Sequence, residues 1–172
     1  MWPRVDHPRW SPADTPKDAA EEQLERPIRL HELRLDTVAA KLQDLGVRRV
    51  VDLGCVSGEL LKRLLAERTF KEIVGIDGSA VSLENAARRL RLETMPERQK
   101  ERIKLLHGAL TYRDRRIEGY DAAALVEVIE HLDPDRLVAL ERAVFEFAGP
   151  EHVIITTPNR EYNTKFEGME PG

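Results

Sequence analysis

The feature that most restricts the fold is a repeated alternation of short apolar runs with longer segments of helical spacing. Strands that alternate with helices of ordinary length form parallel sheets through crossover connections. The sequence therefore predicts an α/β fold with a doubly wound, mostly parallel sheet. The five runs expected to be buried strands are RRVVDLGC, EIVGID, RIKLLHG, YDAAALVE and HVIITTPN.

The predicted helices lie before and between these strands. Their sequences are GELLKRLLAER, SAVSLENAARRLRLE and PDRLVALERAVFEFA, and apolar residues also recur near helical spacing from Ile28 to Leu45. Residues 1–27 hold five prolines among charged and small residues, so we expect a tail or linker there. Residues 28–172 then form one domain. We expect it to lack its C-terminal strands, because the sequence after Asn159 is too short for further strands and their connections.

The composition restricts the class of partner and the compartment. The chain of 172 residues is 41% hydrophobic and 34% charged, which suits a single globular domain. Its net charge of -4 argues against broad, nonspecific attraction to nucleic acid. The apolar runs are far shorter than the roughly 20 residues of a membrane-spanning helix, and no apolar signal core opens the chain. A single cysteine excludes an internal disulfide. These features predict a cytoplasmic protein with no membrane partner.

A glycine loop follows the first predicted strand, in the sequence VVDLGCVSGELL. Asp52 ends the strand, Gly54 lies in the turn and Gly58 begins the next helix, and ligands of open α/β sheets bind at that edge. The spacing lacks the third glycine of a dinucleotide fingerprint and the lysine of a phosphate-binding loop. It is more similar to the first motif of S-adenosylmethionine-dependent methyltransferases. Asp77 ends the next strand, where an acid accepts ribose hydroxyls; the alternative for either acid is a helix cap or a turn residue.

Two glutamates and a histidine follow the fourth predicted strand, in the sequence LVEVIEHLDP. If a helix begins near Glu127, then Glu130 and His131 lie on the same helical face within one turn. Two carboxylates and an imidazole form a ligand set that suits Mg²⁺ or Mn²⁺, whereas the zinc protease motifs need a histidine at other positions. The alternative is a solvent-exposed first turn in which the glutamates favour the helix dipole. The position beside the expected cofactor cleft favours the metal ion.

Six motifs are spread along the chain: VVDLGC, GID, LTYRD, EVIEHLDPDRL, ERAVF and TTPNREYN. Together they resemble the metal-dependent small-RNA 2′-O-methyltransferases, which methylate the 3′-terminal ribose, act in RNA repair in bacteria and protect small silencing RNAs in eukaryotes. The resemblance runs from about Leu30 to Phe166. It implies a Rossmann-like, S-adenosylmethionine-dependent methyltransferase fold. It also implies that Glu127, Glu130 and His131 are the metal ligands and the catalytic residues.

The resemblance and the order of the strands together predict the other site residues, and the resemblance implies the reaction. The cofactor-binding positions are Asp52, Gly54, Cys55, Gly58, Asp77, Ala109 and Leu110, with the last two as an apolar wall for the adenine. Asn159, Tyr162 and Asn163 are expected to contact the substrate or to brace the metal-binding turn. The implied activity is transfer of a methyl group from S-adenosylmethionine to the 2′-hydroxyl of the 3′-terminal ribose of RNA, with Mn²⁺ or Mg²⁺ as the required ion. The implied partners are the RNA 3′ end and other domains of a longer parent protein or an RNA-repair protein.

The sequence departs from that family at two points and leaves two alternatives open. Val56 occupies a loop position where the family has glycine, and a further metal-binding histidine of the family lies in a segment that this chain does not contain. A module that binds the cofactor or a partner without catalysis is therefore open, as is an O-methyltransferase for small diols. A basic stretch from Arg88 to Arg116 suits phosphate contacts, although acidic residues interrupt it and a salt-bridged surface explains it equally well.

Overall fold

The computed structural model describes the backbone of residues 16–158 and the side chains of residues 28–158. The chain divides into two compact units, Met1–Leu33 and Arg34–Gly172. The second unit contains every strand of the sheet, and it holds the described residues that the sequence predicts to form the site.

Helix α1 (Pro16–Asp44) begins earlier than the sequence predicted. The apolar spacing starts at Ile28, and the prolines before it led to the expectation of a tail. The structure makes residues 16–27 helical, which the sequence did not predict; the expected role of residues 1–27 as a tail or linker stays a prediction.

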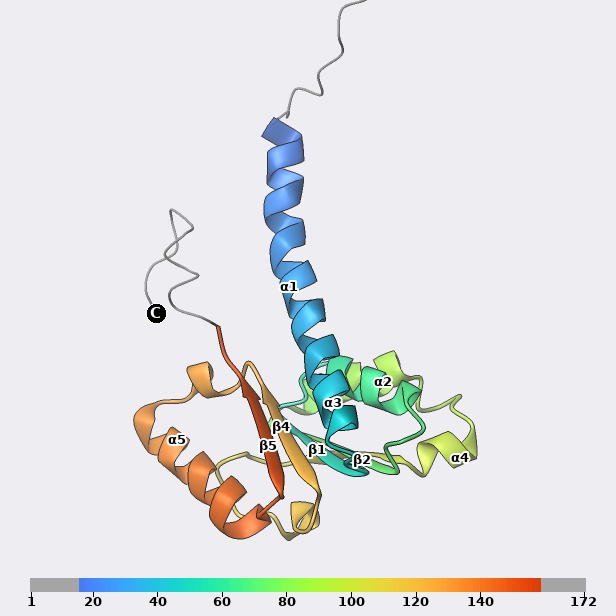
Figure 1. The fold of residues 1–172 in the computed structure, drawn as a ribbon, viewed down its shortest axis with the longest axis vertical. Coiled ribbons are helices and arrows are strands. Elements are labelled where there is room, and N and C mark those ends of the chain that lie inside the picture. Colours follow the sequence, from blue (N-terminus) through green and yellow to red (C-terminus); the bar gives the residue numbers. More distant parts are fainter. Residues whose placement is uncertain (1–15, 159–172) are drawn as a thin grey trace, which may run out of the picture. The chain divides into compact units, whose positions relative to one another are not determined.

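The sheet has five parallel strands in the order β3-β2-β1-β4-β5 (Figure 1). This order confirms the predicted doubly wound sheet, because the chain moves outward from β1 through β2 to β3 and then returns to the other side of β1. The carboxyl ends of β1 and β4 therefore mark the point where the strand order reverses, which is where open α/β sheets bind their ligands. The strands are β1 (Arg49–Leu53), β2 (Glu72–Asp77), β3 (Ile103–His107), β4 (Ala122–Val126) and β5 (His152–Thr156).

Helices and short helical turns connect the strands. Strand β2 and the helices that follow β1, β2 and β4 lie within the segments that the apolar spacing predicted. The short turns α4, η1 and η2 are additions that the spacing did not indicate. The helices are α2 (Glu59–Ala66), α3 (Ala80–Leu90), α4 (Glu97–Lys100) and α5 (Pro134–Glu141), with the 3₁₀ turns η1 (Arg115–Ile117) and η2 (Ile129–His131) and the π-helical segment η3 (Arg142–Ala148).

The two faces of the sheet carry separate apolar cores. Leu61 and Leu64 of α2 pack with Leu42 of α1 and with Phe70 on one face. A second set on the other face covers Val51 and Ile76; its members are Ile117, Tyr120, Leu140, Val144 and Ala148. Both faces are thus buried by helices, which explains why β1, β2 and β4 read as continuous apolar runs rather than as alternating ones.

At the amino ends of the strands, one acidic residue accepts hydrogen bonds from neighbouring segments of the sheet. Glu72, at the start of β2, accepts hydrogen bonds from Arg49 Nε at 3.0 Å, from Lys104 Nζ at 3.0 Å and from the Tyr120 hydroxyl at 2.8 Å. Burial would raise the pKa of this carboxyl, but the hydrogen bonds from Lys104, Tyr120 and Arg49 outweigh it and lower the pKa to about 2. This cluster fixes three neighbouring strands at the end opposite to the candidate site.

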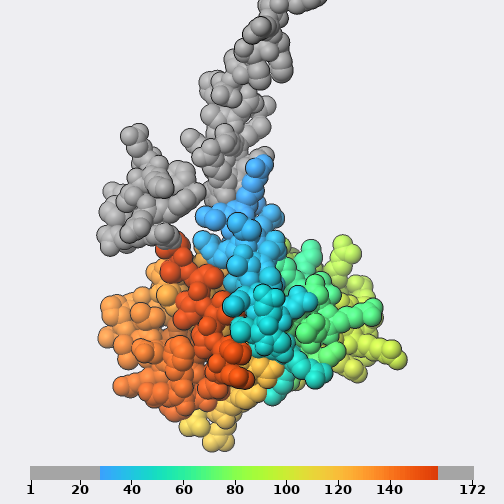
Figure 2. Space-filling model, in the orientation of Figure 1, coloured from blue at the N-terminus to red at the C-terminus, as the bar shows by residue number. Residues whose placement is uncertain are grey.

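The edge strand β5 borders the surface in the space-filling view, where it is drawn in red (Figure 2). Its Ile155 side chain is 44% exposed. Among the described residues no helix is both long and apolar enough to cross a membrane.

Candidate active site

The loop after β1 turns back onto the end of β2. The backbone N–H groups of Gly54 and Cys55 both donate to the carbonyl oxygen of Ile76, at 2.8 Å and 3.0 Å. Three residues of this loop have positive φ angles, Gly54 at 83°, Val56 at 43° and Gly58 at 75°. The two glycines adopt this backbone at little cost, whereas a β-branched residue such as Val56 does so under strain. Val56, at a position where the family resemblance implies glycine, thus lies in a strained turn.

Gly54 allows three loops to meet at the carboxyl edge. A Cβ atom at this position would lie 2.7 Å from Val128 Cγ2 and 3.5 Å from Leu110 Cδ1. Leu110 comes from the loop after β3 and Val128 from the turn after β4. The predicted cofactor loop, adenine wall and metal turn are therefore adjacent, which the sequence alone indicated only through strand order.

Asp77 braces this loop. Its Oδ2 atom accepts a hydrogen bond from Val56 N at 2.9 Å, and its Oδ1 atom accepts one from Ser79 N at 2.8 Å. Each carboxylate oxygen keeps a second lone pair, so the predicted acceptance of ribose hydroxyls stays compatible with these contacts. The structure adds a positioning role that the sequence did not indicate, because the acid at the end of β2 holds the loop that follows β1.

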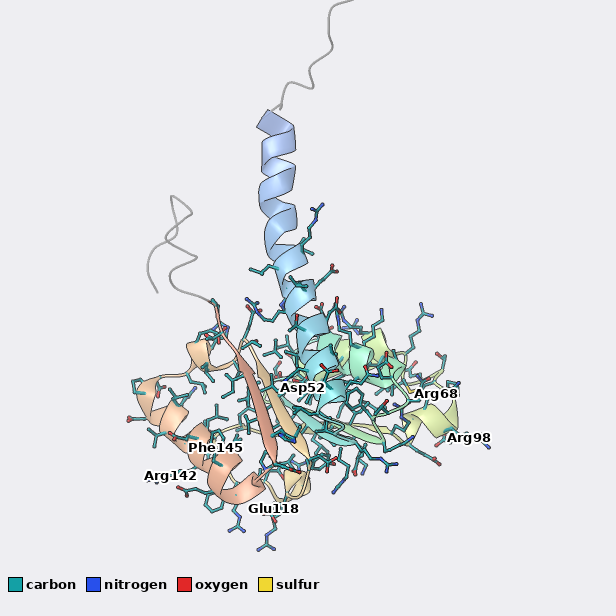
Figure 3. All side chains as sticks on the ribbon, viewed as in Figure 1. Asp52, Arg68, Arg98, Glu118, Arg142 and Phe145 are labelled. Atoms are coloured by element: carbon teal, nitrogen blue, oxygen red, sulfur yellow. The ribbon has the colours of Figure 1, made fainter. Side chains whose placement is uncertain are left out.

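Asp52 lies at the end of β1 and is 2% exposed (Figure 3). Burial, with a smaller contribution from the charge of Asp77, raises the pKa of its carboxyl to about 7. A buried acid whose pKa is near neutrality prefers a cationic neighbour, and the cofactor of a methyltransferase carries a sulfonium and an ammonium group. Its predicted cofactor-binding role is consistent with this environment and stays a prediction.

The side chain of Cys55 packs in the core and does not face the edge of the sheet where ligands bind. The residue is 5% exposed, and a Cβ atom on Gly75 of β2 would lie 2.9 Å from its Sγ. Burial raises the pKa of the thiol above its usual range. Only the backbone of Cys55 could therefore contact the cofactor. Gly75 has no side chain, and this leaves the space in which the thiol packs on β2.

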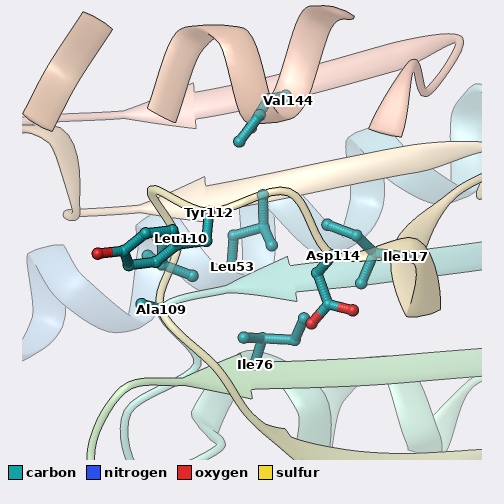
Figure 4. A pocket seen from close by; sticks show the side chains of 9 residues that line it. Leu53, Ile76, Ala109, Leu110, Tyr112, Asp114, Ile117 and Val144 are labelled. Atoms are coloured by element: carbon teal, nitrogen blue, oxygen red, sulfur yellow. The ribbon is translucent and has the colours of Figure 1, made fainter. Parts of the chain in front are cut away.

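The predicted adenine wall lies beside a small interior space. Leu110 and Ala109 line it together with Leu53 and Ile76, and its volume is about 10 Å³ (Figure 4). A space of that size holds at most one water molecule. Adenine would therefore have to lie on the outer side of this wall, where Ala109 is exposed, or displace the Leu110 side chain.

The predicted helix at Glu127 is wrong. Glu127 has a φ of 55°, in the left-handed region that disfavours non-glycine residues, and it precedes the three-residue turn η2. Glu130 and His131 belong to η2 and are exposed. Because no α-helical turn joins the three residues, their side chains do not share one helical face, and residues 28–158 contain no group of three potential ligands arranged to hold a metal ion.

Glu127 instead contacts a cation of the chain. Its carboxylate is ion-paired with the guanidinium of Arg34 on α1, a residue that the sequence did not indicate. Its backbone N–H donates to the carbonyl oxygen of Thr156 at 3.0 Å, and the buried Thr156 hydroxyl has no hydrogen-bond partner among the described residues. The donor atoms of Glu127, Glu130 and His131 suit a divalent cation chemically, but their arrangement is not that of an assembled site.

Most cations of the predicted basic stretch have structural partners. Arg102 donates to the carbonyl oxygens of Phe70 and Leu65, at 2.9 Å and 3.3 Å. Lys104 and Arg116 pair with acids. The salt-bridged alternative therefore explains a large part of this stretch. The predicted substrate residues Asn159, Tyr162 and Asn163 lie outside the described residues.

Comparison with known proteins identifies the family that the chain resembles. The sequence profile of a family described as "Methyltransferase domain" matches residues 51–149. A small RNA 2′-O-methyltransferase of Rattus norvegicus is 36% identical over 124 residues, which are 69% of this chain and 31% of that protein. The methyltransferase domain of bacterial CtHen1 superimposes with a TM-score of 0.77 at 47% identity, covering 81% of this chain and 72% of that one.

The fold is also shared with a more distant enzyme. An S-adenosylmethionine-dependent methyltransferase from Clostridium acetobutylicum superimposes with a TM-score of 0.56 at 17% identity, covering 77% of this chain and 53% of that one. The matched profile defines a methyltransferase domain, and its fold is that of S-adenosylmethionine-dependent methyltransferases. Within that class, the chain belongs to the small-RNA 2′-O-methyltransferase family. It spans about a third of the length of the rat relative.

Proposed function

We propose that this chain is the methyl-transferring part of an enzyme that methylates the 2′-hydroxyl of the 3′-terminal ribose of RNA, with S-adenosylmethionine as the donor. The observation that carries the proposal is the approach of three loops at Gly54, where an added Cβ atom would lie 2.7 Å from Val128 Cγ2 and 3.5 Å from Leu110 Cδ1. This approach puts the cofactor loop next to the turn that carries Glu127. A donor methyl and an acceptor oxygen must meet in such a place for transfer to occur.

The residues of the chain have distinct parts in this proposal. S-adenosylmethionine supplies an electrophilic methyl on a sulfonium centre, so the protein mainly has to align it with a nucleophilic oxygen. Asp77 holds the loop in the conformation that the cofactor meets, through its hydrogen bond to Val56. Asp52 would supply a buried carboxyl, whose raised pKa of about 7 a cationic ligand beside it would lower.

A divalent cation is the second part of the proposal. Glu127, Glu130 and His131 would hold it, since two carboxylates and an imidazole suit Mg²⁺ or Mn²⁺. A cation held at this turn would supply Lewis acidity beside the acceptor oxygen. For the three residues to act together, Glu127 must exchange the guanidinium of Arg34 for the ion. Terminal specificity follows from chemistry, because only the last nucleotide carries neighbouring 2′ and 3′ hydroxyls.

The test is transfer of a labelled methyl group to single-stranded RNAs that differ only at the 3′ end. We expect transfer to an RNA with a terminal diol, and none to RNAs with a terminal 2′-deoxy or 3′-phosphate nucleotide. We also expect transfer to require added Mn²⁺ or Mg²⁺. Equal transfer with EDTA present would refute the metal dependence. Transfer to a small catechol but not to RNA would indicate the small-diol alternative.

A matched pair of variants connects the test to the site. Glu130→Gln should abolish metal-dependent transfer and leave the affinity for S-adenosylhomocysteine unchanged. Glu146→Gln is the control, because Glu146 is also exposed but lies on η3. If both variants keep the activity of the parent chain, Glu130 is not a metal ligand.

A further inference from the structure

One large aromatic side chain is exposed at the edge of the sheet that binds ligands. Tyr112 is 73% exposed and lies on the connection between β3 and β4. Figure 4 shows its ring beside Leu110, on the side to which the strand arrows point, with its hydroxyl directed away from the sheet. Since the strands are parallel, this is the edge at which Asp52 and Asp77 end their strands.

The loop that carries Tyr112 is held at both ends. At its start, Gly108 N donates to the carbonyl oxygen of Asp77 at 3.1 Å. At its end, Asp114 Oδ1 accepts from the N and Nε atoms of Arg116, both at 2.9 Å, and Arg116 Nη2 donates to the carbonyl oxygen of His107 at 3.1 Å. The Tyr112 ring is therefore presented on a braced loop, which reduces the entropy lost when a ligand packs against it.

The position of Tyr112 separates it from the expected cofactor contacts. The Leu110 side chain faces Gly54, because its Cδ1 atom would lie 3.5 Å from a Cβ atom on that glycine. Leu110 is half-buried, whereas Tyr112 is the outer residue. A cofactor that lies on the glycine loop meets Leu110 first, and a second ligand that approaches from solvent meets the Tyr112 ring.

The same loop also carries cations. Arg113 is engaged, since its guanidinium lies 4.8 Å from the Phe147 ring and 3.6 Å from the Glu118 carboxylate. Arg115 is exposed, and no ion pair involves it within residues 28–158. An aromatic ring with a neighbouring cation on a groove edge is typical of surfaces that bind single-stranded nucleic acid, where rings stack on bases and cations contact phosphates.

We propose that the Tyr112 ring stacks on a nucleobase at the 3′ end of the RNA acceptor and thereby positions the terminal ribose beside Val128 and Glu127. This inference rests on the proposed function, because it assigns to the same site a contact with the acceptor strand. Stacking on an aromatic ring does not depend on which base is present, since every base has a flat apolar face. The contact therefore fits an enzyme that recognises an end rather than a sequence.

The experiment measures binding without catalysis. The 172-residue chain is titrated into a 5′-fluorescein-labelled single-stranded RNA, with S-adenosylhomocysteine present, and the Kd is read by fluorescence anisotropy. Two RNAs are compared, one with an ordinary 3′-terminal nucleotide and one whose terminal ribose lacks a base. Tyr112→Ala should weaken binding of the ordinary RNA by about fivefold to a hundredfold, as expected for the loss of one stacked base. Tyr112→Phe should bind like the parent chain.

The comparison of the two RNAs decides the inference. The parent chain should prefer the ordinary RNA over the abasic one, and Tyr112→Ala should lose that preference. The control is Phe145→Ala, because Phe145 is a 56% exposed aromatic residue on η3. Equal weakening by Tyr112→Ala on both RNAs, no weakening at all, or a loss of S-adenosylhomocysteine affinity instead would each overturn the stacking role.

The two proposals fail separately. A parent chain that prefers the ordinary RNA through Tyr112 but transfers no methyl group to it keeps the stacking contact and contradicts the proposed activity. A chain that methylates both RNAs and binds them equally well keeps the activity and contradicts the contact.

Discussion

The guanidinium of Arg34 on α1 is paired with the carboxylate of Glu127, the residue that follows β4. The two residues are 93 positions apart in the sequence, and their side chains are 17% and 28% exposed. The pair connects α1 to the turn that carries the predicted metal ligands. The carboxylate that we expect to bind a cation is thus already beside a cation supplied by the chain itself.

Replacing Arg34 should expose this competition. Arg34→Gln removes the ion pair from a part-buried carboxylate, so we expect unfolding to become easier by roughly 1–3 kcal/mol without added metal. The same variant should bind Mn²⁺ more tightly than the parent chain, because the ion no longer displaces a guanidinium. Thermal unfolding with and without Mn²⁺ measures both effects.

A second ion pair on the same helix provides the control. Arg63 donates to Asp36 at 2.5 Å, and the Asp36 side chain is 64% exposed. Such surface pairs contribute little, so Arg63→Gln should change stability by less than about 1 kcal/mol and leave the Mn²⁺ response unchanged. An Arg34→Gln chain with the stability and Mn²⁺ affinity of the parent would show that the pair does not restrain the turn.

Gly54→Ala should disrupt the site through two separable effects. The φ of 83° is unfavourable for alanine, and the new Cβ would lie 2.7 Å from Val128 Cγ2. Gly46→Ala isolates the first effect, since Gly46 has a φ of 70° and nothing within 4 Å of its Cβ position. Both variants should lose about 1 kcal/mol of stability from backbone strain in urea unfolding. In calorimetry only Gly54→Ala should also lose affinity for S-adenosylhomocysteine; retained affinity would mean that the three loops can separate without harm.

Val56→Gly should relieve strain in the same loop. A left-handed backbone costs a non-glycine residue about 1–2 kcal/mol, whereas glycine adds about 0.5–1 kcal/mol of unfolded-state entropy. The valine side chain is 58% exposed and loses little burial, so the strain term wins and the variant should gain stability. Val81→Gly is the matched control: Val81 is 64% exposed in the right-handed helix α3, and there the same change should cost roughly 0.5 kcal/mol. Destabilisation of both variants by the same amount would argue against strain at Val56.

The sequence predicted those parts of the molecule that local patterns determine. Strand β2 has the predicted bounds, and Pro134, directly after the capping residue Asp133, marks the start of α5. The same pattern shows why the helix expected at Glu127 was wrong. The helix begins at Pro134, and the preceding residues Ile129–His131 form a short 3₁₀ turn.

The remaining features depend on contacts between distant segments. No local signal indicates that Arg34 reaches Glu127, that Asp77 supports Val56 or that Val128 covers Gly54. The family resemblance indicated the loops of the candidate site, but the conformation of Glu127 and the exposure of Tyr112 required the structure.

Asp52 should make the stability of the protein fall as the pH rises. Its pKa is raised from 3.8 to about 7 in the folded chain, so between these values the folded state holds a proton that the unfolded state has released. The folded state then binds more protons, and the free energy of unfolding decreases with increasing pH across that window. Each pKa unit corresponds to about 1.4 kcal/mol, so the loss between pH 4 and pH 7 is on the order of a few kcal/mol.

Urea unfolding at several pH values measures this contribution. Asp52→Asn removes the titrating group, so its stability should match the parent chain near pH 4 and exceed it at pH 8. Glu72 serves as the comparison, because its contribution to the free energy of unfolding increases rather than decreases with pH. Its folded pKa of about 2 lies below the ordinary 4.5, so it stabilises the fold above that value, and Glu72→Gln should lose this benefit at neutral pH. An Asp52→Asn chain whose stability falls between pH 4 and pH 7 as steeply as that of the parent would place the titrating group elsewhere, because the substituted side chain cannot release a proton.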